Sequence, residues 1–473
     1  MTALLNPILR RFAEHFPLPT MARAVLERCL NPEQLDAWFE RTAEGQYTRT
    51  LLFSTLFEVM MQVVTRQHPS VHAAYQAAKA PIAVSVKSVY NKLNGVETST
   101  SAALVRYSAE QAAGLIVEVG GARPGWLGGY RIKVLDGNWL EGREHRLQET
   151  RTQTAAPLPG KALLVFDPAL DVITDCVPCE DAYTQERALV PEVLTRVQAG
   201  ELWIADRNFC FKGFLWALAQ RGAVGLVREH EQIRFTPLEA LRVIGEIDSG
   251  RVSEQRVVID HPEGPGTIQA RRIRVELNEP TREGETELYL LSTVPEEVAD
   301  ACILAQLYRA RWTLEKAFLH LTVQLRCEIT TLGYPSAALF GLAVAVVAYN
   351  VLAVVKATLR QVHGVEAIDE GVSGYYIVNE MANVAESLET LIEPEDWTVF
   401  QTLTLVAMAT WLIETAGRVQ LRKYRKHSRG PKKPPAKRYH DPNRPHVSVA
   451  RVLAERKKSQ GTRGNQGKLK AMP

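Results

Sequence analysis

The sequence has few of the features that would assign it at once to a class. Only 6 of its 473 residues are cysteine, and 7% are aromatic. So few cysteines in so long a chain do not make a disulfide scaffold, and they fit a reducing compartment. No glycine-rich phosphate loop of the Walker type occurs, so we expect no nucleotide cofactor. The segment from Met1 to Pro7 has no basic stretch ahead of an apolar one, so we expect no secretory signal and a cytoplasmic location.

The net charge of +3 hides an uneven distribution of charge along the chain. Residues 418–473 contain 18 lysines and arginines against two acidic residues, a net charge of +16. The other 417 residues carry 38 basic and 51 acidic side chains, a net charge of −13. A basic block can neutralise phosphates and release their counterions. We interpret 418–473 as a flexible DNA-binding tail, and a disordered tail that only keeps the protein soluble explains it equally well.

Only one long apolar run occurs, from Ala337 to Val355. Its 19 residues could span a membrane by length alone. However, the run is rich in Ala and Val, carries Asn350 near its end, and has no second apolar segment beside it. A helix that is apolar all round is also typical of the centre of a large soluble protein. We therefore predict a buried core helix and no membrane partner.

The first part of the chain, residues 1–125, has apolar residues at helical spacing and is predicted to be a helical region. Within it, Ser85 is placed to cap a short helix that Gly95 ends. The exposed face of this helix would carry Lys87 and Lys92, which can contact phosphates or base edges as in a helix-turn-helix. An ordinary surface helix explains the same pattern equally well.

Residues 126–330 have a different texture, in which short apolar runs alternate with helical segments. This order predicts an α/β sheet. Residues 230–295 break the alternation with short strands among Gly, Pro and charged residues, which predicts a β-rich insertion. Residues 331–417 are predicted to be a C-terminal helical region. The expected strands are 131–135, 162–166, 172–174, 201–205, 223–227, 256–259, 268–275 and 287–291, and the expected helices are 185–197, 211–220 and about 295–326.

Two carboxylates stand where predicted strands end. Asp136 follows the strand 131–135, and Asp206 follows the strand 201–205. A carboxylate in this position is held on a rigid element at the edge of the sheet, where a substrate can reach it. One such aspartate is usually a cap or turn residue, but two on neighbouring strands suggest a site for Mg²⁺, which prefers carboxylate oxygens.

A third group of polar residues lies on the predicted helix 295–326. Tyr308, Arg311 and Glu315 are spaced i, i+3 and i+7, so they share one face of a helix. A tyrosine, an arginine and a glutamate together suggest a phosphate site beside a metal ligand. The spacing alone favours a simpler reading, an amphipathic helix with an ion pair between Arg311 and Glu315.

This helix resembles the Tyr-x2-Arg-x3-Glu-x6-Lys signature of the insertion-sequence-four family of bacterial DDE transposases. Further motifs of the family occur in the same order over roughly residues 130–330. Each motif is weak alone, but their order and spacing are fairly specific. They are Val134-Leu135-Asp136-Gly137, Glu144-His145-Arg146-Leu147, Pro157-Leu158-Pro159-Gly160-Lys161, Asp167-Pro168 and Ile204-Ala205-Asp206-Arg207.

The resemblance implies an RNase H-like catalytic core that is interrupted by the β-rich insertion. It implies that Asp136, Asp206 and Glu315 are catalytic and together hold two Mg²⁺ ions, for which Mn²⁺ can substitute. The reaction it implies is cut-and-paste transposition by two-metal phosphoryl transfer. In the family, cleavage typically passes through a hairpin end.

The resemblance also implies the partners and the residues that bind them. The partner is double-stranded DNA, as transposon terminal inverted repeats and as target, in a bacterial, nucleoid-associated setting. Synapsis of two ends implies a homodimer. Tyr308 and Arg311 would contact phosphates of the transposon end, and Tyr289 would stack on a flipped base. Alternatively, Tyr289 is a strand aromatic packed in a small core.

One position departs from the family pattern. The lysine expected seven residues after Glu315 is Thr322 here. Another residue, such as Arg326, would have to supply that contact with phosphate. The departure also supports an alternative function, a catalytically inactive, transposase-derived DNA-binding protein or repressor. A third possibility is an RNase H-like nuclease that is unrelated to transposition.

Overall fold

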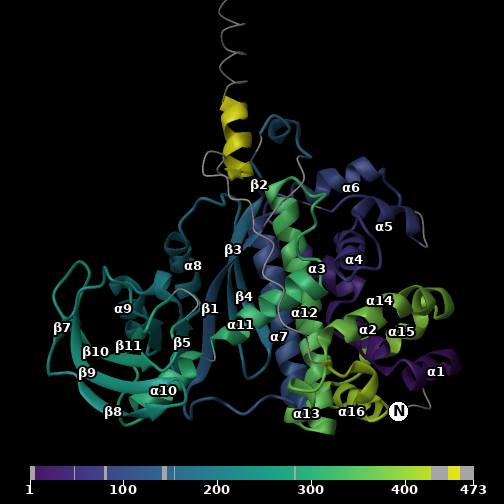
Figure 1. Cartoon of the computed structure of the whole chain (residues 1–473). Coiled ribbons are helices and arrows are strands. Elements are labelled where there is room, and N and C mark those ends of the chain that lie inside the picture. The colour runs from purple at the N-terminus through teal and green to yellow at the C-terminus, as the bar shows by residue number, and fades with distance from the viewer. Residues whose placement is uncertain are drawn as a thin grey trace, which may run out of the picture.

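The computed structural model describes most of the chain, and Figure 1 shows how its helices and strands are arranged. Seven helices precede the first strand, as the helical pattern of the first 125 residues predicts. The described residues are 6–46, 48–78, 82–140, 146–153, 155–281, 284–309, 311–427 and 446–458. The seven helices are α1 (Pro7–His15), α2 (Pro17–Leu30), α3 (Pro32–Thr42), α4 (Phe53–Val64), α5 (Val71–Ala77), α6 (Val86–Leu93) and α7 (Thr98–Val119).

Helix α12 (Pro335–His363) runs through the centre of the protein. Among the described residues it is the one helix long and apolar enough to cross a membrane, and 94% of its most apolar window is buried within the protein. Its polar residue Asn350 is fully satisfied, because its side chain exchanges two hydrogen bonds of 3.0 Å with the backbone of Ile173 and donates to Ser108. The predicted core helix is confirmed.

The long helix α7 packs along α12 and ends where the two come closest. Gly120 adopts a left-handed conformation, with φ of +74°, and terminates α7. A Cβ atom on the next residue, Gly121, would lie 1.9 Å from the carbonyl oxygen of Ala357 on α12. Only glycine therefore permits this approach of the two backbones.

The short helix α6 forms as the sequence predicts. Its cap residue Ser85 accepts a hydrogen bond from the backbone N–H of Ser88, which satisfies one of the free donors at the start of the helix. Gly95 follows within the turn that ends it. The predicted helix is therefore confirmed.

Ten of the described strands form a mixed sheet against one side of the helices. The first five strands lie in the order β4-β3-β1-β5-β6. The pairs β1–β3 and β3–β4 are antiparallel, whereas β1–β5 and β5–β6 are parallel. The predicted α/β layout is confirmed. These strands are β1 (Arg131–Leu140), β3 (Gly160–Asp167), β4 (Val172–Cys179), β5 (Glu201–Ala205) and β6 (Val224–Arg228).

The β-rich insertion does not form a separate layer, because its strands continue the same sheet. Strand β11 (Glu287–Ser292) pairs antiparallel with β6, and β10 (Thr267–Leu277), β9 (Gly250–Asp260) and β7 (Thr236–Pro237) follow in order. Strand β8 (Arg242–Ile247) pairs with the other half of β9. In Figure 1 the insertion strands therefore continue the sheet beyond β6, the strand that pairs with β11.

Several predicted elements differ from the structure in their bounds. The strands predicted at 172–174 and 256–259 are longer, as β4 and β9. Strand β1 continues to Leu140 instead of ending before Asp136, because its pairing with β3 extends that far. The predicted helix 185–197 is a 3-10 turn, η3 (Glu186–Leu189), followed by the short helix α8 (Val190–Leu194). The predicted helix 295–326 is divided into α10 (Ala301–Arg309), α11 (Trp312–Leu319) and a π-helix, η5 (His320–Gln324).

The C-terminal region is helical as predicted, but part of the basic tail packs on the body of the protein. Strand β12 (Val447–Ser448) pairs with β2 (Pro157–Leu158), and residues 449–458 are helical. Arg451 pairs with Asp181 at 2.8 Å. Residues 418–427 and 446–458 of this tail thus contact the body of the protein, and residues 428–445 and 459–473 lie outside the described residues. The C-terminal helices are α13 (Val365–Asp369), α14 (Gly374–Leu391), α15 (Pro394–Thr402) and α16 (Leu405–Ala416).

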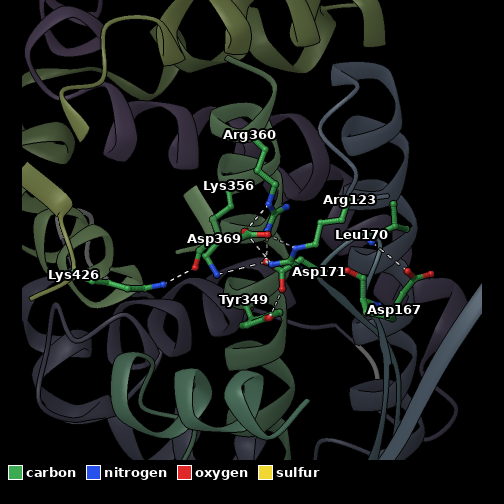
Figure 2. Close-up of polar contacts among 10 residues, drawn as sticks. Arg123, Asp167, Leu170, Asp171, Tyr349, Lys356, Arg360, Asp369 and Lys426 are labelled. Atoms are coloured by element: carbon green, nitrogen blue, oxygen red, sulfur yellow. Dashed lines mark hydrogen bonds and ion pairs between the residues drawn. The ribbon is translucent and has the colours of Figure 1, made fainter. Parts of the chain in front are cut away.

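A buried ion cluster joins the β3–β4 turn to α12 (Figure 2). Asp171 sits in this turn with a left-handed φ of 61°. It pairs with Arg360 at 2.6 Å, Arg123 at 3.3 Å and Lys356 at 3.7 Å, and it accepts a hydrogen bond of 2.9 Å from the Tyr349 hydroxyl. Burial would raise the pKa of Asp171, but Lys356, Arg123 and Arg360 together hold it below its ordinary value.

Candidate active site

The two predicted aspartates lie next to each other at the edge of the parallel strands. The pairing of β1 with β5 ends at Leu135 and Ala205, so Asp136 and Asp206 are the next residues on neighbouring strands. Asp206 caps the 3-10 turn η4 (Arg207–Phe209) and accepts a 2.8 Å hydrogen bond from the backbone N–H of Asn208. The expected juxtaposition of two carboxylates is therefore present in the structure.

Arg311 connects Asp136 to Glu315. Its guanidinium donates to Asp136 Oδ2 at 2.8 Å and to Glu315 Oε1 at 2.9 Å. The Arg311 side chain is 13% exposed, whereas that of Glu315 is 52% exposed. The ion pair that the spacing favoured is therefore formed. The same guanidinium, which the resemblance assigns to DNA phosphate, also neutralises part of the charge on Asp136.

Asp136 is poorly neutralised despite its bond to Arg311. Its pKa is raised from 3.8 to about 7, chiefly by burial and further by the nearby carboxylates Asp206 and Glu186. Arg311 and the backbone N–H of Gly137 oppose this increase. Asp136 therefore holds a proton up to a higher pH than an ordinary aspartate does, and a nearby cation would favour its ionised form.

The raised pKa of Asp136 predicts a pH-dependent stability. Between about pH 4 and pH 7 the folded protein holds the Asp136 proton more tightly than the unfolded chain does, so the stabilisation is lost as the pH rises through about 7. For one proton the slope is at most about 1.4 kcal/mol per pH unit. In EDTA, Asp136→Asn should gain thermal stability over wild type progressively from pH 5 to about pH 7, and the gain should level off above that pH. A difference in Tm that stays constant over this range would contradict the prediction.

Glu186 is a further carboxylate of this site, and the sequence pattern did not single it out. A Cβ atom on Gly137 would lie 2.1 Å from Glu186 Oε1, so the glycine next to Asp136 makes room for this carboxylate. Asn208 donates its side-chain amide to Glu186 Oε2 at 3.2 Å while its backbone N–H binds Asp206. One residue therefore orients two carboxylates. The available signal in the sequence was the Asp136-Gly137 pair, but it does not show what fills the space.

The two tyrosines expected to contact DNA are both engaged within the protein. Tyr308 on α10 is buried, and burial raises its pKa to about 12. It does not share one continuous helix with Glu315, because α10 ends at Arg309 and α11 begins at Trp312. Tyr289 on β11 is half-buried, donates to Glu287 at 2.6 Å, and lies under the Arg272 guanidinium at 4.2 Å. Tyr289 belongs to neither hydrophobic core cluster of the described residues, and its stacking on a base stays a prediction.

The residues expected to contact DNA phosphate through a positive charge lie in two places, on α6 and after η5. Lys87 on α6 is exposed, whereas Lys92 is half-buried and donates to the Leu51 carbonyl at 3.1 Å. Arg326 donates to the Pro69 carbonyl at 2.8 Å, which ties the end of η5 to the N-terminal region. Thr322, at the position of the family lysine, is exposed and donates to the Phe318 carbonyl within its own helix.

The donor chemistry at this site fits hard divalent cations, but the third expected ligand is paired with an arginine. Asp136 and Asp206 offer adjacent carboxylates, whose oxygens Mg²⁺ prefers. Glu315, however, is bonded to Arg311. Among the described residues, no three His, Cys, Asp or Glu side chains meet closely enough to hold a metal ion. Glu144 and His145 of the family motif lie outside the described residues.

Comparison with known proteins gives little further information. No protein-family model matches the chain, and a search of curated proteins finds no match. Among solved structures, the chain is similar to the piggyBac transposase in a synaptic complex with hairpin DNA. The two share 12% sequence identity with a TM-score of 0.36, over 84% of this chain and 86% of that one. A similarity this low establishes neither a shared fold nor a shared function.

Proposed function

We propose that the chain is a DDE transposase of the insertion-sequence-four type, which cuts transposon ends and joins them to target DNA. The observation that carries the proposal is the adjacency of Asp136 and Asp206, directly beyond the last residue pair of β1 and β5. Glu315 is tied to the same place through Arg311, which bonds to both Asp136 and Glu315. Three residues from distant parts of the chain, matched by one family pattern, thus lie around one arginine.

The strand order also supports an RNase H-like core. In that fold, the first strand of the sheet is antiparallel to the second and parallel to the fourth, which lies on its other side. The order β4-β3-β1-β5-β6 and its directions agree with this arrangement. The position of the insertion between Asp206 and Glu315 agrees with it as well.

In this proposal, Asp136, Asp206 and Glu315 would hold two divalent ions, whose chemistry would be to activate the nucleophile and to stabilise the leaving oxygen. The protein's own groups position the carboxylates. Asn208 orients Asp206 through its backbone N–H, and Arg311 orients Asp136 and Glu315 through its guanidinium. Phosphate of the transposon end would compete with these carboxylates for Arg311, which would release Glu315 toward the two aspartates.

The competing function is a DNA-binding protein or repressor without catalysis. Thr322 favours it, because no cation stands at the position of the family lysine. The test is to incubate the full chain with duplex DNA carrying the inverted repeats that flank its gene, in Mg²⁺ or Mn²⁺, and to resolve the strands by gel. Nicks at the repeat ends support the transposase, binding without nicks supports the repressor, and equal cutting of DNA without repeats supports a nuclease.

The position of Glu186 predicts that it supports the metal site. Glu186→Gln should weaken Mn²⁺ binding by about ten- to a hundredfold, because supporting groups around metal ligands have effects of this size. Binding would be measured from the electron paramagnetic resonance signal of free Mn²⁺. Gly137→Ala should have a similar effect, since its methyl group would displace the Glu186 carboxylate. The matched control is Glu192→Gln, an exposed glutamate on α8. If Glu186→Gln and Glu192→Gln bind Mn²⁺ equally well, the role of Glu186 is excluded.

A further inference from the structure

A cavity of about 800 Å³ lies between helices from the two ends of the chain. Its walls come from α2, α4, α14 and α15, which Figure 1 shows on the side of α12 away from the insertion strands. This volume is in the range of ligand-binding pockets. It also equals roughly two turns of an α-helix with its side chains, given a helix about 10 Å across. We call it the end-helix groove.

The end-helix groove combines an apolar floor with an acidic lining. Leu30, Phe57, Met61 and Leu388 belong to the floor and are buried. At the rim, Leu52 is 43% exposed. One arginine, Arg23, lines the groove together with five glutamates, which are Glu27, Glu58, Glu389, Glu393 and Glu395. The groove therefore offers a surface for an apolar partner that also carries positive charge.

Among the described residues that line the groove, Arg23 is the one lysine or arginine. It pairs with Glu27 at 3.2 Å and lies over the Trp397 ring at 5.7 Å. Burial and then the neighbouring Glu58 carboxylate raise the pKa of Glu389, although Arg23, a hydrogen bond from Gln62 and His68 oppose the increase. Like charges that face each other across a partly buried surface are relieved by a cation from a partner.

We infer that the end-helix groove binds an amphipathic helix of a partner protein. The apolar face of that helix packs on the floor of the groove, and a lysine or arginine lies between Glu58 and Glu389. Helix-in-groove binding uses apolar anchors on one helical face in this way. The acidic lining repels DNA phosphate, so this surface is distinct from the proposed DNA site. The chain's own basic helix at 449–458 is held elsewhere, because Arg451 pairs with Asp181 and Arg456 pairs with Glu149.

The test uses the full chain and two fluorescent peptides of 14 residues. Both carry leucine at i, i+3, i+7 and i+10, and the other positions are lysine and alanine in one peptide and glutamate and alanine in the other. Fluorescence anisotropy should show the lysine peptide bound at least tenfold more tightly than the glutamate peptide. Equal binding of the two peptides, or no binding of the lysine peptide, would overturn the inference.

Variants of the chain locate the binding. Glu58→Gln combined with Glu389→Gln should weaken binding of the lysine peptide at least fivefold, and Ala385→Trp, which fills the groove, should prevent it. The matched control combines Glu366→Gln with Glu370→Gln, two exposed glutamates away from the groove. Thermal melting verifies that each variant is folded. If the Glu58/Glu389 variant binds as tightly as wild type, or if the control loses binding to the same extent, the groove is not the site.

Discussion

Asp136→Asn, Asp206→Asn and Glu315→Gln are each expected to reduce cleavage of terminal-repeat DNA by roughly a thousandfold or more, the scale of losing a group that acts only in the transition state. Each replacement keeps the size of the side chain and removes a negative charge. Cleavage would be measured as strand nicks over time in Mg²⁺. DNA binding should remain within a few-fold of wild type in a gel-shift assay, because phosphate contacts set most of the affinity.

The control for these variants is Asp260→Asn. Asp260 is the last residue of β9, and its side chain is 61% exposed. The Asp260→Asn protein should therefore cut DNA at the wild-type rate. A variant that melts at the wild-type temperature and still cuts DNA at a comparable rate would remove that residue from the catalytic set. Each of the three residues is therefore tested by its own variant. The proposed class of enzyme depends most on Asp136 and Asp206, because their adjacency carries the proposal.

Asp171→Ala is expected to destabilise the protein by about 3–5 kcal/mol, the range for breaking a buried ion pair by removing one partner. The replacement would leave Arg360 buried and Arg123 and Lys356 partly buried, with Asp369 as the remaining acidic partner in the cluster of described residues (Figure 2). Since folded proteins are stable by only about 5–15 kcal/mol, much of the chain should unfold or aggregate on expression. Urea unfolding measures the loss.

Two further variants define the cause of that loss. Asp171→Asn retains an acceptor for the Tyr349 hydroxyl but not the charge, so most of the loss should remain. Glu263→Ala, in the exposed loop between β9 and β10, should change the free energy of unfolding by less than about 0.5 kcal/mol. If Asp171→Ala is no less stable than Glu263→Ala, the cluster does not stabilise the fold.

Local patterns predicted the elements whose cause is local. The strand Glu201–Ala205 agrees with its predicted bounds, and Ser85 caps α6 as predicted. The buried helix α12 was predicted because no other segment could pair with it in a membrane. The predicted helix 185–197 was wrong in length, since Pro191 and short-range turns interrupt it. The prediction of one long helix over 295–326 was wrong, since the structure has two separate helices, α10 and α11, and the π-helix η5 there.

The candidate site shows where local patterns stop being informative. The adjacency of Asp136 and Asp206 was predictable from two similar strands that lie side by side, although β1 continues past Asp136 to Leu140. The placement of Glu186 was not, since it depends on how η3 packs against Gly137. The bond from Arg311 to Asp136 joins residues 175 positions apart and depends on tertiary packing. The direction of the Lys92 side chain, which donates to the Leu51 carbonyl, likewise depends on tertiary packing.

The position of α12 in the chain has a consequence for synthesis of the protein. All of the proposed catalytic residues are made before residue 335, but α12, which shares with α7 the cover of β3 and β4, is made afterwards. While the ribosome is still translating α12, the parts of α7, β3 and β4 that pack on it therefore stay exposed. A fragment of residues 126–330 would retain Asp136, Asp206 and Glu315, yet it would lack this cover and should aggregate. A messenger RNA cut short before α12 would accordingly yield no active enzyme.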